Sequence, residues 1–174
     1  MPIDPDTKDW TWVLERPCDE CGFDASALPA ATVPALVRGN VTQWRPLLLA
    51  GDGTPRPGVA ERPSDDRWSA IEYACHVRDV FRLYDERLAL MLTRRNPTFP
   101  NWDQDETAVS DRYIEQAPVQ VLAGLEAAGQ LITAMPDGQR ERADEVRPAA
   151  DRIERRSGAG PQELSGQVEE DALV

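Results

Sequence analysis

His76 is the only histidine of the 174-residue chain, and its neighbours could support acid/base or metal chemistry. Glu72 lies four residues before it and Asp79 three residues after it, so all three share one side of a helix. Neutral imidazole binds first-row divalent metals well and exchanges protons near neutral pH. We therefore predict His76 as the single metal-ligand candidate, with Glu72 and Asp79 orienting its ring. A partly buried histidine paired with either carboxylate is the plainer interpretation of the same residues.

Cys18 and Cys21 form a second candidate site. Their Cys-x-x-Cys spacing is that of half a zinc ribbon or of a thiol redox pair. A structural zinc site needs four ligands, and the remaining soft ones, Cys75 and His76, point about 100° apart if they lie on one helix. No helix is expected to begin at Gly22 and activate a thiol. A reduced surface turn is favoured, with zinc binding and redox activity as the open alternatives.

Other polar and aromatic groups suggest no complete site. The carboxylates between residues 103 and 111 lack the glycine and the final glutamate of a calcium-binding loop, which favours a solvated acidic loop. No phosphate-binding glycine loop and no Ser/His/Asp arrangement can be assembled. Four tryptophans are interpreted as packing anchors: Trp10, Trp12, Trp68 and Trp102.

Charge and hydropathy exclude several partners. A net charge of −12 leaves no surplus of Lys and Arg to neutralise phosphate, so we expect neither nucleic acid nor an anionic membrane as a partner. The longest apolar run, residues 47–50, is far too short to span a bilayer. The first residues lack the basic-then-apolar order of a signal peptide. A cytoplasmic protein with reduced thiols is the expectation.

Three segments show the apolar spacing of helices. The first has Thr32 as its expected cap and Pro34 near its start, and Pro46 should kink or end it. Its apolar face has a spacing of three or four residues: Val33, Leu36, Val37, Val41, Trp44 and Leu48. A loop is predicted over residues 51–63, which are rich in glycine and proline.

The second and third helices are expected after that loop. Ser69 and Glu72 have the spacing of a capping box, and the helix should run from Ser69 to about Arg94. Its expected apolar side comprises Tyr73, Val77, Val80, Phe81, Tyr84, Leu88, Met91 and Leu92, opposite Asp79, Arg82 and Glu86. A loop over 96–106 and a short helical piece around 111–116 should follow. Pro118 then starts the third helix, with Val121, Leu122, Leu125, Ala128, Ile132 and Met135 on one face.

No segment alternates apolar and polar residues with period two, so an all-α fold is predicted. Residues 1–30 are interpreted as an irregular arm carrying the Cys-x-x-Cys pair, and residues 31–136 as a helical bundle. Residues 137–174 are highly charged and contain no aromatic residue, which is typical of a disordered tail.

Three stretches together carry a family resemblance: residues 6–24 (DTKDWTWVLERPCDECGFD), 68–80 (WSAIEYACHVRDV) and 96–105 (NPTFPNWDQD). In combination they resemble the actinobacterial branch of the DinB-like superfamily, over residues 6 to about 135. Related members include YfiT-like hydrolases and thiol-dependent enzymes such as the mycothiol-dependent maleylpyruvate isomerase.

The resemblance implies an up-down four-helix bundle, often a homodimer, that holds one divalent cation, Zn or Ni, with three histidines. It also implies metal-assisted transfer or hydrolysis that involves a small thiol or another small-molecule substrate. One histidine comes from the second helix and two come from the last. Only His76 can be carried over, onto the second-helix ligand, because no histidine follows it. We therefore expect a degraded or absent fourth helix and weak or no metal binding.

Two explanations of this departure stay open. The sequence after about Met135 could be read in a shifted frame, or the chain has diverged into a structural or dimerising helical module without a metal. Catalysis follows from the resemblance only if the native gene product completes the metal site.

Overall fold

The structure, a computed structural model, describes residues 11–134. Within that range the regular elements are all helices, joined by loops that carry two isolated β-bridges, which confirms the all-α prediction. The α-helices are α1 (Val33–Leu48), α2 (Ala70–Thr93), α3 (Gln104–Ser110) and α4 (Pro118–Thr133). Short 3-10 turns occur at η1 (Thr11–Leu14), η2 (Ala30–Thr32) and η3 (Tyr113–Glu115). The predicted tail, 137–174, and the first ten residues of the predicted arm lie outside the described range.

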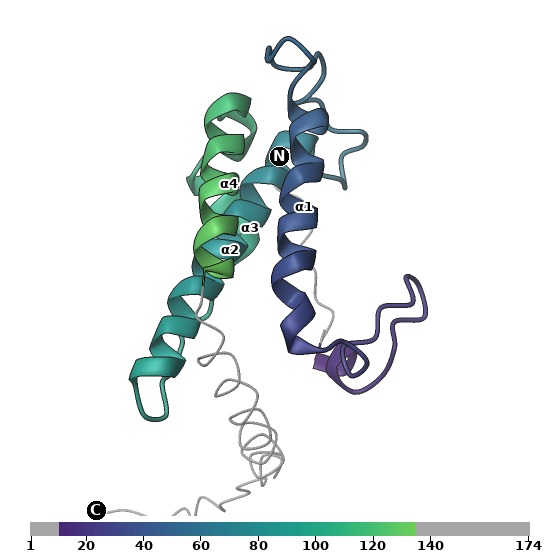
Figure 1. The fold of residues 1–174 in the computed structure, drawn as a ribbon. Helices are drawn as coiled ribbons and strands as arrows, with labels where there is room; N and C mark the ends of the chain where they lie inside the picture. Colours follow the sequence, from purple (N-terminus) through teal and green to yellow (C-terminus); the bar gives the residue numbers. More distant parts are fainter. Residues whose placement is uncertain (1–10, 135–174) are drawn as a thin grey trace, which may run out of the picture.

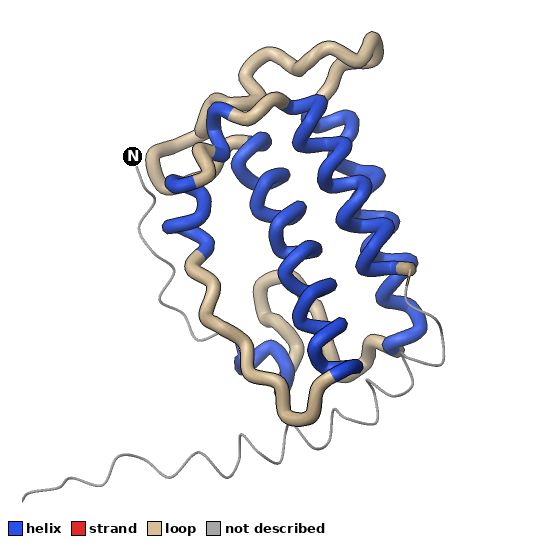
Figure 2. The backbone as a smooth tube through the Cα atoms, turned by 90° about the vertical axis from the view of Figure 1, so that its left-hand side faces the viewer, coloured by secondary structure: helices blue, strands red, loops and turns tan. Residues whose placement is uncertain are grey.

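The three long helices pack side by side, with α4 contacting both α2 and α1 (Figures 1 and 2). The core lies where the end of α1 meets the start of α2, the 3-10 turn η3 and the start of α4. Its buried members are Leu48, Leu49, Ile71, Ala74, Cys75, Tyr113, Val121, Leu122 and Leu125. The C-terminal end of α2 projects past the end of α4 (Figure 1).

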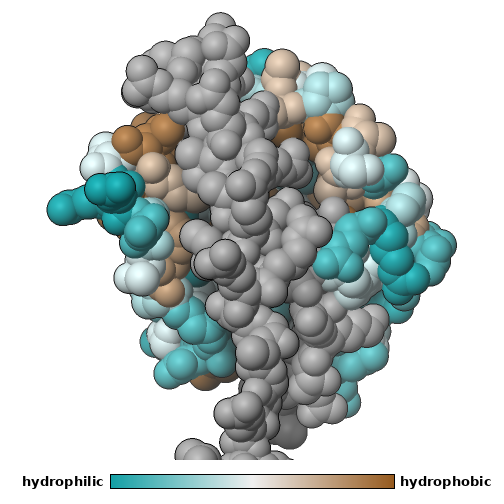
Figure 3. All heavy atoms as spheres, turned by 90° about the horizontal axis from the view of Figure 1, so that it is seen from below, coloured by the Kyte–Doolittle hydropathy of each residue, from teal (hydrophilic) through white to brown (hydrophobic). Residues whose placement is uncertain are grey.

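Apolar side chains also remain on the surface of the described part. Among them are Leu36 and Leu47 on α1, Met91 on α2 and Leu131 on α4. The end of the molecule seen in Figure 3 shows apolar residues beside strongly hydrophilic ones. The long helices therefore bury only part of their apolar surface against one another.

The start of α1 differs from the prediction. Thr32 stands at the N-cap position, but its hydroxyl donates to the Pro29 carbonyl oxygen at 2.7 Å and makes no capping bond to the helix. Pro46 does not end the helix, which continues to Leu48. A proline in the last turn removes only one N–H donor from the helix. The Leu49 N–H still donates to the Arg45 carbonyl at 2.9 Å.

The capping box of α2 is confirmed. The Ser69 hydroxyl accepts from the Glu72 N–H at 3.4 Å, and the Glu72 carboxylate accepts from the Ser69 N–H at 2.9 Å. The predicted apolar face of α2 is wrong in part, because Tyr73, Tyr84 and Met91 are exposed. The buried positions are Ile71, Glu72, Ala74, Cys75 and Arg78. Glu72 and Arg78 can lie on the buried side because each is paired with a residue of opposite charge.

The segment before α4 holds more helix than predicted. Asp103 caps α3 by accepting from the N–H groups of Asp105 and Glu106, at 3.0 and 2.9 Å. The predicted loop over 96–106 therefore ends early, and the helical piece expected at 111–116 is the 3-10 turn η3. The start at Pro118 is confirmed, and Val121, Leu122, Leu125 and Ala128 are buried as predicted. Met135 lies outside the described residues.

Gly129 marks the close approach of α4 to α1. A Cβ added at this position would meet the Val41 Cγ2 methyl at 2.5 Å, and a β-branched side chain has few rotamers with which to move away. We expect Gly129→Ala to lower the free energy of unfolding by about 1 kcal/mol net, because overpacking outweighs the gain in helix propensity.

Gly39→Ala is the matched control, because Gly39 lies within α1 and a Cβ there meets nothing within 4 Å. It should raise stability by about 1 kcal/mol through helix propensity alone. Urea unfolding of the two variants measures both changes. Equal stabilisation by both substitutions would contradict the close approach.

Candidate site around His76

His76 lies on α2, half-buried between two tryptophans. Its ring stacks on Trp102, with centroids 5.5 Å apart and planes 10° apart, and it lies 5.3 Å from the tilted Trp68 ring. Trp68 directly precedes the N-cap of α2, and Trp102 directly precedes the Asp103 cap of α3. The two capped helix starts thus hold the indoles against the imidazole, which agrees with their interpretation as packing anchors.

The Nδ1 atom of His76 is buried and has no hydrogen-bond partner among residues 11–134. Burial lowers the pKa of His76, while the charges of Asp79 and Asp105 act in the opposite direction without overcoming it. The ring is therefore neutral at neutral pH. A neutral ring nitrogen without a protein partner is the chemical feature that a metal ligand requires.

The Glu72 carboxylate is engaged elsewhere. It accepts from Arg62 Nε, at 2.9 Å to Oε2, and forms an ion pair with Arg62 Nη2. It also accepts from the Ser69 hydroxyl at 2.8 Å. Burial would raise the pKa of Glu72, but the bonds from Arg62 and Ser69 outweigh it and leave the pKa low. The predicted pairing of Glu72 with His76 is wrong, because Arg62 binds this carboxylate from the loop before α2.

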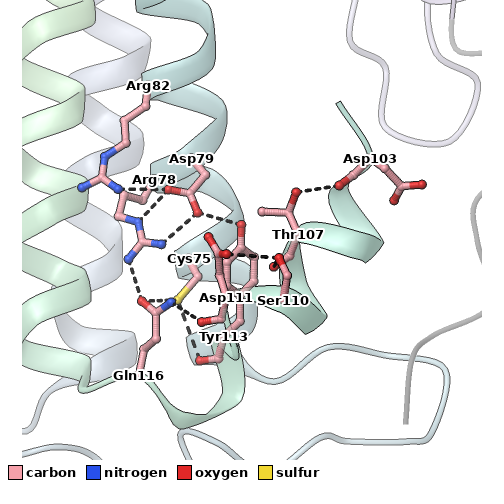
Figure 4. Close-up of polar contacts among 10 residues, drawn as sticks. All are labelled: Cys75, Arg78, Asp79, Arg82, Asp103, Thr107, Ser110, Asp111, Tyr113 and Gln116. Atoms are coloured by element: carbon pink, nitrogen blue, oxygen red, sulfur yellow. Dashed lines mark hydrogen bonds and ion pairs between the residues drawn. The ribbon is translucent and has the colours of Figure 1, made fainter. Parts of the chain in front are cut away.

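Asp79 is likewise committed, to a polar network that joins α2 to η3 (Figure 4). It accepts from Arg78 at 2.9 and 2.8 Å, from the Tyr113 hydroxyl at 2.7 Å and from Arg82 at 3.2 Å. Arg78 also donates to the Gln116 side chain at 2.7 Å. Burial opposes ionisation of Asp79, but these donors hold its pKa below the ordinary value. The predicted orienting bond from Asp79 to His76 is absent, and Asp79 pairs instead with Arg78 and Arg82.

Cys75 faces away from this arrangement although it adjoins His76 in sequence. Its thiol is buried in the core, 3.5 Å from the Gln116 side-chain oxygen and 3.9 Å from the Tyr113 carbonyl. Burial raises the pKa of Cys75 to about 12, so the thiol stays protonated. In the part of the chain that the structure describes, no three His, Cys, Asp or Glu side chains come together as a metal site.

The partners that sequence reasoning missed are Trp102, Arg62 and Tyr113. Trp102 stacks on the imidazole. Arg62 donates hydrogen bonds to the Glu72 carboxylate, and the Tyr113 hydroxyl donates one to the Asp79 carboxylate. All three come from other elements, so spacing along α2 carries no signal for them. A local signal does exist for the two tryptophans, because each directly precedes a residue type that caps helices, Ser69 after Trp68 and Asp103 after Trp102.

A search of protein-family models, of curated proteins and of solved structures finds no match to this chain. Between residues 11 and 134, no helix combines the length and the apolar character that crossing a membrane requires.

Burial of His76 gives a testable pH dependence. An unfolded histidine titrates near pH 6.5, and the folded value is lower, so the unfolded chain binds more protons just below that pH. The contribution of neutral His76 to the free energy of unfolding is therefore fully present above about pH 6.5. It is lost as the pH falls toward the pKa of the folded state. Asp79 and Glu72, whose pKa values are lowered, lose their contribution only near pH 4 and below.

His76→Phe retains an aromatic ring between the tryptophans and removes the titrating group. We expect the wild type to lose stability between pH 7 and pH 5.5, and the variant to lose distinctly less. Urea midpoints at the two pH values measure this difference. Identical pH slopes for both proteins would mean that His76 is not buried as a neutral ring.

Proposed function

We propose that this chain is a DinB-like helical-bundle protein whose His76 corresponds to the metal ligand of the second helix. We further propose that it acts as a non-catalytic helical module, because one imidazole cannot retain a divalent ion. The observation that carries this proposal is the buried Nδ1 of His76, on the second long helix, without a partner among the described residues. Its burial between Trp68 and Trp102 is consistent with a ligand position held in place by the fold.

The electrostatics around His76 support the absence of a working metal centre. A catalytic zinc site has three protein ligands and an open position for water or substrate. The carboxylates that could substitute for histidine are bound by cations, Glu72 by Arg62 and Asp79 by Arg78. Releasing Asp79 would leave the buried Arg78 without its counter-ion, which costs several kcal/mol, and releasing Glu72 would break its bonds to the half-buried Arg62.

The chemistry of metal-containing relatives depends on what the ion does to its ligands. A bound Zn²⁺ or Ni²⁺ lowers the pKa of a coordinated water or thiol and so generates the nucleophile. With the ion lost, the small-thiol or small-substrate chemistry of such enzymes is lost with it. Homodimer formation through the helical surfaces and a cytoplasmic location remain part of the proposal.

Nickel titration followed by tryptophan fluorescence tests this function. A paramagnetic ion bound to His76 would lie against Trp68 and Trp102 and quench their emission. We expect no saturable quenching at about one equivalent of Ni²⁺ that depends on His76, and therefore identical titrations for the wild type and His76→Ala. Saturable quenching at one equivalent that His76→Ala abolishes would overturn the proposal.

A further inference from the structure

The segment from Cys18 to Phe23 is a closed turn. The Gly22 N–H donates to the Cys18 carbonyl at 2.8 Å, and the Cys18 N–H donates to the Phe23 carbonyl at 2.8 Å. Gly22 has a φ of 71°, in the left-handed region that residues with a side chain rarely adopt. A glycine directly after the second cysteine thus lets the chain reverse and hold both cysteines in one turn.

Both cysteines belong to this closed turn, and the turn lowers the pKa of Cys18. Hydrogen bonding to the Cys21 and Glu20 backbone and to the Cys21 side chain is the cause, against the weaker effects of burial and of the Glu20 charge. Cys18 is half-buried and Cys21 is exposed, so solvent reaches the pair, in contrast to the core thiol Cys75.

We propose that Cys18 and Cys21 form a two-thiolate binding site for Zn²⁺, independent of His76. Thiolates are strong ligands for zinc, and hydrogen bonds from amides to a ligand sulfur stabilise its negative charge. Binding displaces the thiol protons of both cysteines to solvent, so that two anionic sulfurs face one divalent cation. Glu20, exposed between the cysteines, adds negative charge that favours a cation here, whereas Asp19 is paired with Arg16 at 3.8 Å.

The ion bound at this turn would remain open to exchange. Structural zinc has four protein ligands, and the turn provides two. The other soft ligands of the chain, Cys75 and His76, are held in the core and between the tryptophans. Water or other exchangeable donors would complete the coordination, so chelators should remove the ion readily.

A disulfide is the competing fate of this pair, and the surroundings disfavour it. Thiol exchange with a small anionic disulfide requires attack by a thiolate next to the exposed Glu20, whose charge repels such a reagent. No helix begins at the turn, since the next helical residues are Ala30–Thr32, so no helix dipole assists the exchange. The same charge favours binding of a divalent ion.

Cobalt titration of the reduced, full-length chain tests the site, because Co²⁺ bound to cysteine thiolate gives a charge-transfer absorption band. We expect this band in the wild type and its displacement by Zn²⁺. Cys18→Ser and Cys21→Ser should each abolish it, and both variants should keep the wild-type helical content, because the turn lies outside the core.

His76→Ala and Cys75→Ala are the matched controls and should retain the band, which separates this site from the function proposed for His76. Absence of the band in the wild type would overturn the proposal. So would a band that persists in Cys18→Ser or Cys21→Ser, or one that disappears in His76→Ala.

Discussion

Asp79→Ala is expected to lower the free energy of unfolding by about 3 kcal/mol, the lower end of the range for a broken buried ion pair. The Asp79 and Arg78 side chains are only 15% and 10% exposed, so solvent cannot replace the lost partner well. The substitution also leaves the Tyr113 hydroxyl, which donates to Asp79 at 2.7 Å, without its acceptor. The substitution would thus remove the bond by which Asp79 links α2 to η3.

Glu86→Ala is the control for this change, because Glu86 lies exposed on the same helix. Exposed substitutions of this kind change stability by about 0.5 kcal/mol or less. Urea unfolding at pH 7 gives both values. An Asp79→Ala variant as stable as Glu86→Ala would show that the network contributes nothing to the fold.

Leu125→Ala should be the other strongly destabilising substitution, with a loss of about 2–5 kcal/mol. Leu125 is fully buried on α4 in the core formed with α1, α2 and Tyr113. Truncation removes apolar contacts and leaves a cavity that the surrounding helices can fill only in part.

Leu131→Ala on the same helix is its matched control, since Leu131 is 61% exposed. The same chemical change there should alter stability by about 0.5 kcal/mol or less. Thermal or urea unfolding compares the two variants directly. A large loss at Leu131 with little loss at Leu125 would mean that α4 packs through its opposite face.

Local signals in the sequence were sufficient for the long helices. The Ser69–Glu72 spacing sets the start of α2, and Pro118 sets the start of α4, because both act within one helical turn. The same reasoning failed at Thr32, whose hydroxyl bonds to the preceding Pro29 carbonyl instead. A residue type with two possible local partners cannot be assigned to one of them from spacing alone.

The buried face of α2 and the partners of His76 depend on distant residues. Arg78 can be buried because the Asp79 carboxylate and the Gln116 side-chain oxygen accept its hydrogen bonds, and the apolar pattern of α2 contains no sign of that network. His76 could be singled out as the only histidine. The stacking of Trp102 on its ring and the capture of Glu72 by Arg62 arise from tertiary packing and could not be predicted.

The most direct measurement is the amount of nickel or zinc bound per chain after saturation and gel filtration, with Cys18 and Cys21 both changed to serine. In that background we expect far less than one ion per chain, and the same amount after adding His76→Ala. One ion per chain that disappears with His76→Ala would contradict the claim that this imidazole alone holds no divalent metal.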